Sequence, residues 1–339
     1  MTSPHVDAGE ATGTEDALAR SGTDPAEATD PADPAEATEP AEAAEATGPS
    51  EATKVTTVRK RFSPLSVLRT LRHHPLGLAG GLLLTLVVAF CFLGPLVHPT
   101  NQTDVDLLNA SLPPGPGHPL GTDPNGFDVL GRLMAGGKVS LQIGLLAALF
   151  ATTLGTVYGA VAALAGGMLD GFLMRVVDIL LSVPFLFFVL ILSARFHANA
   201  VTLALVIGGF SWLVSARLVR GEVLTLRVRE FVLAARVMGA SRRRLILTHL
   251  IPNALGVIIV NITFQVADAV LVVAALGFLG FGLTYPTADW GSQLASGATY
   301  ISADHWWLIY PVGGCIILTV LALNLLADAL RDAVGRRAD

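Results

Sequence analysis

Residues 76–97 read LGLAGGLLLTLVVAFCFLGPLV, an uninterrupted apolar run without a charged side chain. At a rise of about 1.5 Å per residue, a helix of this length crosses a bilayer core of about 30 Å. Further apolar runs lie near residues 140–165, 171–194, 199–217, 253–276 and 306–328. The sequence therefore predicts an all-α, polytopic membrane bundle of six transmembrane helices.

The composition of the whole chain agrees with a membrane protein. Of its 339 residues, 52% are hydrophobic and only 14% are charged, which argues against a soluble enzyme. The sequence contains no His-Glu-x-x-His segment, no Gly-x-Ser-x-Gly segment and no cysteine pair at metal-binding spacing. We therefore expect neither catalytic residues nor a metal site.

Residues 1–53 form an acidic tail that differs from the rest of the chain. Residues 1–51 contain thirteen acidic residues and one basic residue, in a repeating Ala, Glu, Pro and Thr composition that predicts disorder. A regulatory tail and a dispensable extension both fit, and the composition favours the second. Because the tail lacks the features of a cleavable signal peptide, we expect the first span to remain as an anchor.

The distribution of Lys and Arg predicts the orientation of the 76–330 transmembrane domain. The segments richest in these residues are 54–75, 218–252 and 331–339. The remaining loops contain only Arg132, Lys138 and Arg195. Since positively charged segments stay in the cytoplasm, both termini and the 218–252 loop are predicted to be cytoplasmic.

The 218–252 loop shows more internal organisation than membrane topology requires. Residues 229–253 read REFVLAARVMGASRRRLILTHLIPN. The pattern predicts a helix from about Glu230 to Met238 that ends at Gly239. Ser241 is a suitable N-cap for a second, amphipathic helix, which we expect to end at Pro252.

The same residues resemble the EAA loop of ABC importer permeases. The match comprises Ala234-Ala235, Gly239, His249 and Pro252 at the family's spacing, and its form is similar to that of the dipeptide, oligopeptide and nickel importers. Leu233 stands where the family has a glutamate. The ion pair of that glutamate is therefore expected to be absent or shifted to Glu230.

The resemblance continues over about residues 74–331. Further matching segments are His118–Asp123, Leu276–Gly280 and Asn324–Asp332. It implies a type I ABC importer permease fold in the bacterial plasma membrane, and a chain that forms half of a heterodimeric pore in contact with lipid. The implied partners are a second permease, two ATP-binding cassette subunits that use ATP and Mg, and an extracytoplasmic solute-binding protein.

The resemblance implies no nucleic-acid partner and no cofactor bound by this chain. Within the family, dipeptides, oligopeptides, nickel chelates and glutathione all remain open as substrates, with peptides the leading class. The short helix after Gly239 would dock into the ATPase, with Leu245 and Ile246 as apolar anchors and arginines for register. The complete set of residues expected to couple to the ATPase is Glu230, Ala234, Ala235, Gly239, Arg242, Arg244, Leu245, Ile246, His249 and Pro252.

Polar groups inside the spans are the candidates for the translocation pathway, because an ionisable group in hydrocarbon costs several kcal/mol without a partner or water. Asn261, Gln265 and Asp268 are spaced to share one face of the fifth span. They either line the cavity or form hydrogen bonds to a neighbouring helix, and the sequence leaves both open. Asp178, a weaker pathway candidate, is expected to form an internal ion pair with Arg175.

Two other classes of protein compete with the importer permease. A secondary transporter would use Asp268 as its ion carrier. Two observations argue against this class: no internal inverted repeat is evident, and a secondary transporter does not need a coupling-type loop such as 218–252. An integral membrane enzyme would need clustered catalytic groups, whereas the histidines are dispersed along the chain.

Overall fold

The computed structural model describes residues 74–196, 199–301 and 304–335, and these ranges are largely helical. The predicted disorder of residues 1–53 and most of the 54–75 basic segment lie outside the described residues. The elements are α2 (Pro75–Val97), η1 (Leu107–Asn109), α3 (Val129–Ala165), α4 (Gly167–Leu181), α5 (Phe185–Arg195), α6 (Ala200–Leu226), α7 (Glu230–Val237), α8 (Arg242–Arg244), η2 (Leu245–Leu250), α9 (Ile251–Phe278), α10 (Trp290–Ala298), η4 (Trp306–Leu308) and α11 (Tyr310–Gly335).

Five helical segments of the described chain are long and apolar enough to cross a membrane, and they contain α2, α3, α6, α9 and α11. The sixth predicted span is a pair of helices, α4 and α5, that meet at a bend of 76°. The expectation of one continuous helix over 171–194 is therefore corrected. The break falls at Pro184, which has no N–H to donate and disfavours helical geometry at Val183.

Helices α3, α6 and α11 extend beyond the predicted bounds of their spans. Helix α11 continues past residue 328 to Gly335, so residues 331–335 belong to the helix and not to a tail. Helix α3 begins at Val129, where the Asp128 carboxylate caps it by accepting a hydrogen bond of 2.7 Å from Gly131 N. Helix α6 continues to Leu226, so the loop that follows it begins near residue 227 rather than 218. Arginines had suggested an earlier end to α6, but long basic side chains are compatible with a continuing helix.

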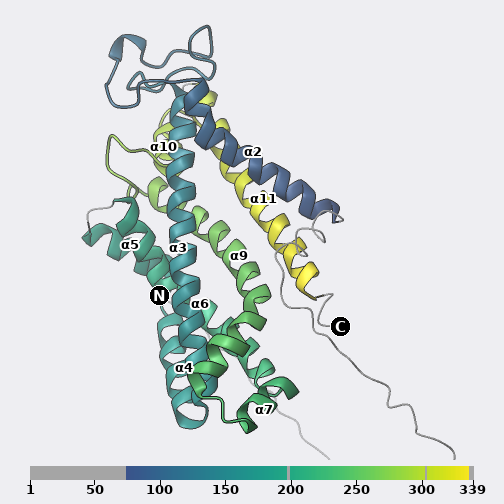
Figure 1. Cartoon of the computed structure of the whole chain (residues 1–339). Coiled ribbons are helices and arrows are strands. Elements are labelled where there is room, and N and C mark those ends of the chain that lie inside the picture. Colours follow the sequence, from purple (N-terminus) through teal and green to yellow (C-terminus); the bar gives the residue numbers. More distant parts are fainter. Residues whose placement is uncertain (1–73, 197–198, 302–303, 336–339) are drawn as a thin grey trace, which may run out of the picture. The chain divides into compact units, whose positions relative to one another are not determined.

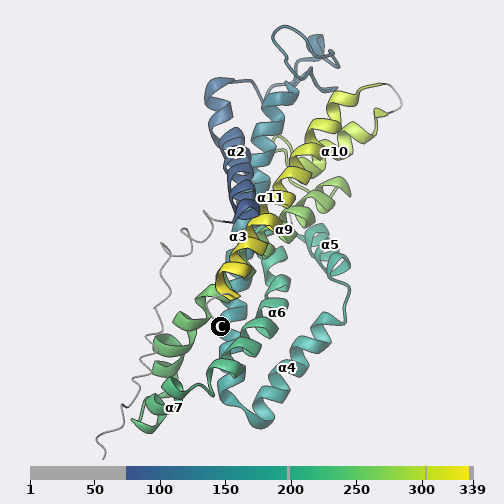
Figure 2. The same ribbon diagram turned by 90° about the vertical axis from the view of Figure 1, so that its right-hand side faces the viewer.

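Helices α3, α6 and α9 form the centre of the transmembrane domain (Figure 1). Helix α11 packs against α9 and α2, and α2 also contacts α3 (Figure 2). The short helix α10 inserts Trp290 between these elements, where the indole is fully buried and donates a hydrogen bond of 3.0 Å to Leu133 O. This contact fixes α10 to the first turns of α3.

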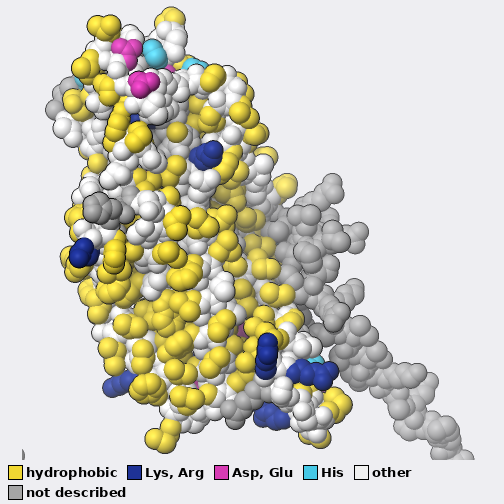
Figure 3. All heavy atoms as spheres, turned by 60° about the vertical axis from the view of Figure 1, so that its left-hand side comes forward, with side chains coloured by type: hydrophobic (Ala, Val, Ile, Leu, Met, Phe, Trp, Pro, Cys, Tyr) yellow, Lys and Arg dark blue, Asp and Glu magenta, His cyan; other side chains and the backbone are white. Residues whose placement is uncertain are grey.

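The two ends of the domain differ in charge. In Figure 3, apolar side chains cover the middle of the visible face, several Lys and Arg lie at the α7 end, and acidic and histidine side chains lie at the opposite end. Exposed leucines on α2 include Leu78, Leu82 and Leu86. Such a band of exposed apolar side chains matches the hydrocarbon region of a bilayer.

The contact between α3 and α6 requires glycine at Gly155. A Cβ added there would lie 2.5 Å from Ser215 Cβ and 2.7 Å from Trp212 O. Because the second obstacle is backbone, the clash cannot be relieved by a side-chain rotation. Small residues such as this glycine allow two membrane helices to approach closely.

We predict that Gly155→Ala destabilises the protein by about 1–3 kcal/mol, the usual cost of overpacking a close contact. Gly209→Ala is the matched control, because a Cβ at Gly209 on α6 meets no atom within 4 Å. The midpoint of heat-induced unfolding of the purified protein in detergent measures both. Equal midpoints for the two variants would contradict the packing argument.

Candidate functional site

The segment between α6 and α9 contains the residues that resemble a coupling loop. Helix α7 ends where the sequence predicts, with Gly239 at φ +82°. Gly239 N donates to Arg236 O and Ala240 N to Ala235 O, each at 3.0 Å. This pair of bonds is a Schellman motif, which satisfies the last carbonyls of a helix and favours glycine.

The second helix starts as predicted but does not end at Pro252. Ser241 caps it, because its hydroxyl accepts a bond of 3.3 Å from Arg244 N. The chain then passes through the π-helical turn η2 directly into α9, with Pro252 in the first turn of α9. The wider turn avoids the clash that a proline ring makes with a carbonyl four residues earlier, so the helix continues.

The apolar face of this segment is buried within the chain itself. Leu245 and Leu250 are 2% and 0% exposed, and they pack with Val232 and Ala235 of α7. Ile246 is half-buried against the same cluster. The role of partner anchor expected for Leu245 is therefore corrected: its side chain fastens α7 to α9 and is not available to another subunit.

The exposed apolar side chains of this loop lie on α7 and at its C-terminal end, not on the second helix. The sequence analysis did not predict this surface. Val237 is 89% exposed, Met238 81% and Leu233 45%. We call these three residues the α7 tip. The i, i+4 spacing of Leu233 and Val237, opposite the buried Val232, was the available signal.

The other residues predicted to couple to the ATPase differ in how exposed they are. Ala234, Gly239 and Arg244 are exposed, His249 is half-buried, and Ala235 faces inward. The side chain of Arg242 lies outside what the structure describes. Glu230 is exposed and forms no salt bridge with a described residue.

The polar groups of α9 fall into two kinds. Asn261 Nδ2 and Gln265 Nε2 donate to Ser215 Oγ of α6 at 2.8 and 2.9 Å. Both side chains are 8% exposed, so the structure places them in interhelical hydrogen bonds. Asp268 is exposed and has no hydrogen bond or salt bridge to a described residue. The predicted common face therefore brings together the first two residues only.

The ion pairs of α4 differ from the prediction. Asp178 pairs with Arg217 of α6, not with Arg175 of its own helix. One turn along α6, the Arg220 guanidinium makes two bonds of 2.6 and 2.7 Å to Asp170. Helix α6 continues nine residues beyond the predicted end of the span at residue 217, so Arg220 also lies on this helix, beside α4.

The glycines and lysine at residues 136–138 lie inside α3, so they form no phosphate-binding loop. Within the described ranges, no group of three or more His, Cys, Asp and Glu side chains is arranged to hold a metal ion. Two features of the described residues are candidates for function. One is the α7 tip, which the buried cluster around Leu245 supports, and the other is Asp268, whose carboxylate is exposed within the span α9.

Comparisons with known proteins identify the family of the chain. Residues 155–339 match the family described as "Binding-protein-dependent transport system inner membrane component". Residues 63–114 match "N-terminal TM domain of oligopeptide transport permease C". The chain is 38% identical to the oligopeptide transport system permease protein OppC of Haemophilus influenzae, over 75% of this chain and 82% of that protein.

Two other relatives have similar coverage. The dipeptide transport system permease protein DppC of Bacillus subtilis is 35% identical over 78% of this chain and 83% of its own length. OppC of Escherichia coli K12 is 37% identical over 78% of this chain and 88% of its own length. The chain therefore belongs to the family of inner membrane components of binding-protein-dependent transport systems, which are the multi-pass permease subunits of ABC importers.

Proposed function

We propose that this chain forms half of the translocation pore of an ATP-driven importer for peptides. A second permease would supply the other half, two ATP-binding cassette subunits would bind ATP and Mg, and a solute-binding protein would deliver the peptide. The relatives named for oligopeptide and dipeptide transport support the substrate class. The observation that carries the coupling role is the exposed α7 tip on a rigidly packed loop.

The geometry of the loop supports mechanical coupling to the ATPase. The α7 tip offers apolar side chains for a docking groove, and the nearby Arg236 and Arg244 offer charges for its rim. The chain runs from η2 into α9 without a break. Arg227, just after α6, donates a bond of 2.8 Å to Ala163 O at the end of α3. A force on the tip would therefore reach α9 directly, and α6 and α3 through this contact.

The orientation that fits this function places the α7 end in the cytoplasm. Several arginines of the 227–244 segment are exposed there, and basic segments are retained on the cytoplasmic side of a membrane. The termini would then be cytoplasmic as well. The α10 end would face outward, toward the solute-binding protein.

Asp268 is the strongest candidate for a pathway residue. A charged carboxylate facing lipid costs about 2.5–3.5 kcal/mol near the middle of a span. Because Asp268 has no partner among the described residues, contact with a watery pathway or with the second permease would remove that cost. Asn261 and Gln265 are buried by α6 and do not share this role.

We predict that Met238→Asp uncouples the importer without unfolding it, because the side chain is 81% exposed. In the co-purified complex, peptide-stimulated ATP hydrolysis should fall by about tenfold, the effect of about 1.4 kcal/mol lost from an apolar contact. Met168→Asp is the matched control, since Met168 is 95% exposed in the first turn of α4. Stimulation that survives Met238→Asp, or a chain that co-purifies with no ATPase subunit, would refute the coupling role.

We predict that Asp268→Asn lowers ATP-dependent peptide uptake by about fivefold, the effect of about 1 kcal/mol on a pathway contact. Folding should be unaffected, because no described residue depends on the carboxylate. Asp104→Asn, which alters an exposed acid outside the spans, is the control in the same proteoliposome assay. Unchanged uptake would exclude Asp268 from the pathway, and uptake driven by an ion gradient without ATP would favour a secondary transporter.

A further inference from the structure

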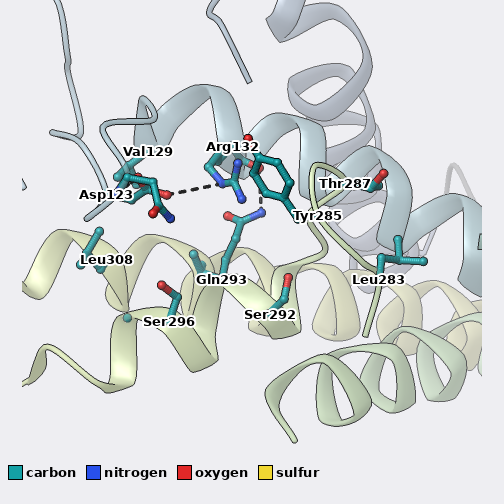
Figure 4. Close-up of a pocket in the computed structure, with 13 residues that line it drawn as sticks. Asp123, Val129, Arg132, Leu283, Tyr285, Thr287, Ser292, Gln293, Ser296 and Leu308 are labelled. Carbon is teal, nitrogen blue, oxygen red and sulfur yellow. Dashed lines mark hydrogen bonds and ion pairs between the residues drawn. The ribbon is translucent and has the colours of Figure 1, made fainter. Parts of the chain in front are cut away.

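A cavity of about 250 Å³ with polar and apolar lining residues lies at the α10 end of the domain (Figure 4). It is formed by the first turn of α3, one face of α10, the loops that precede these two helices, and Leu308 of η4 and Val312 of α11. Binding pockets for small molecules usually measure about 300–1,000 Å³. The cavity lies just below this range, so it suits only a small ligand or one end of a longer ligand.

Arg132 of α3 is the cation of this cavity. Its side chain is 15% exposed, and its guanidinium lies 4.3 Å from the centre of the Phe127 ring. Gln293 Nε2 of α10 donates a bond of 2.8 Å to Arg132 O, which joins the two helices behind the guanidinium. Figure 4 shows the arginine side chain between Asp123 and Tyr285. Packing thus holds the charge in a defined position.

The charge of Arg132 is only partly balanced. Its Nε lies 3.6 Å from Asp123 Oδ2, longer than the 2.7–2.9 Å of a strong charge-assisted bond. The other oxygen of Asp123 already accepts bonds of 2.9 Å from Asn125 N and Phe127 N. Burial raises the pKa of Asp123 above its ordinary value, against the opposing effects of these bonds and of Arg132.

The Arg132 side chain makes no hydrogen bond to a described residue, although a guanidinium has five donors in a planar fork. On this partly exposed side chain, the free donors are left for water or a ligand to satisfy. A carboxylate matches this fork with two parallel bonds. Thr287 and Ser296, which also line the cavity, are exposed and add hydroxyl groups near its opening.

We propose that this cavity binds a short peptide by its C-terminal carboxylate, with Arg132 as the receptor of that carboxylate. The inference rests on the proposed peptide import and adds a subsite within the permease itself. A small ligand is favoured over an acidic side chain of a docking protein, because the guanidinium is recessed in a concave site lined by polar groups from several segments.

The test measures binding of radiolabelled tri-alanine and of tri-alanine amide to the co-purified importer complex in nanodiscs, without the solute-binding protein. We expect tri-alanine to bind at least about tenfold more tightly than the amide, as for a charge-assisted contact. Arg132→Gln should weaken binding of tri-alanine to the level of the amide and leave the amide unchanged. Arg195→Gln, an exposed arginine outside the cavity, should change neither.

A second variant keeps the test decisive where Arg132→Gln folds poorly. Ser296→Phe fills the exposed opening of the cavity and leaves the Arg132–Asp123 pair in place. It should reduce binding of tri-alanine by about tenfold or more. Absence of tri-alanine binding to the unaltered complex, equal binding of the amide, or full binding by the Ser296→Phe variant would overturn the subsite.

Uptake of tri-alanine by the complete importer separates this inference from the proposed function. Uptake without carboxylate-dependent binding at the cavity would overturn the subsite and leave peptide import standing. Binding that is lost in Arg132→Gln, in a complex that transports no peptide, would support the subsite and overturn peptide import.

Discussion

The close packing of α3 against α6 at Gly155 is the contact on which the other features depend. It places Ser215 of α6 where Asn261 and Gln265 of α9 both reach its hydroxyl. In a bilayer, where water cannot satisfy buried polar groups, such bonds fix the rotation of a helix about its axis. With the rotation of α9 fixed in this way, Asp268 is left on the exposed surface of the domain.

The same packing determines how the loop is presented. Leu245 and Leu250 pack in one buried cluster with residues of the two central helices, namely Ala160 and Ala163 of α3 and Val223 of α6. Burial of two leucines contributes about 1.5–3 kcal/mol each relative to exposure. A loop fixed by that amount moves as a unit with α9, whereas a loop tied only at its two ends would absorb a displacement of its tip.

Local signals predicted much of this structure. Apolar runs predicted the spans because length and the absence of charge are properties of a single segment. Gly239 and Ser241 predicted the helix end and the N-cap because both effects act within a few residues.

The features that the sequence did not predict depend on which distant segment of the chain packs against a given residue. Leu245 was expected to face a partner, because an amphipathic pattern shows that one face is apolar but not what covers it. Arg217 was unrecognised as the partner of Asp178, since the pair joins residues far apart in the chain. Pro252 was expected to end the second helix, because proline disrupts a regular α-helix. The π turn before it accommodates the proline ring and lets the helix continue, which residue preferences alone do not show.

The charged groups of the domain differ in what balances them, and this difference separates architecture from binding. Asp170 and Asp178 each form an ion pair with an arginine of α6, and these two pairs hold α4 against α6. Arg132 has only the long ion-pair contact of 3.6 Å to Asp123, and Asp268 has no ion-pair partner among the described residues. Their charges are therefore available to groups outside the described chain, such as water, a ligand or the second permease.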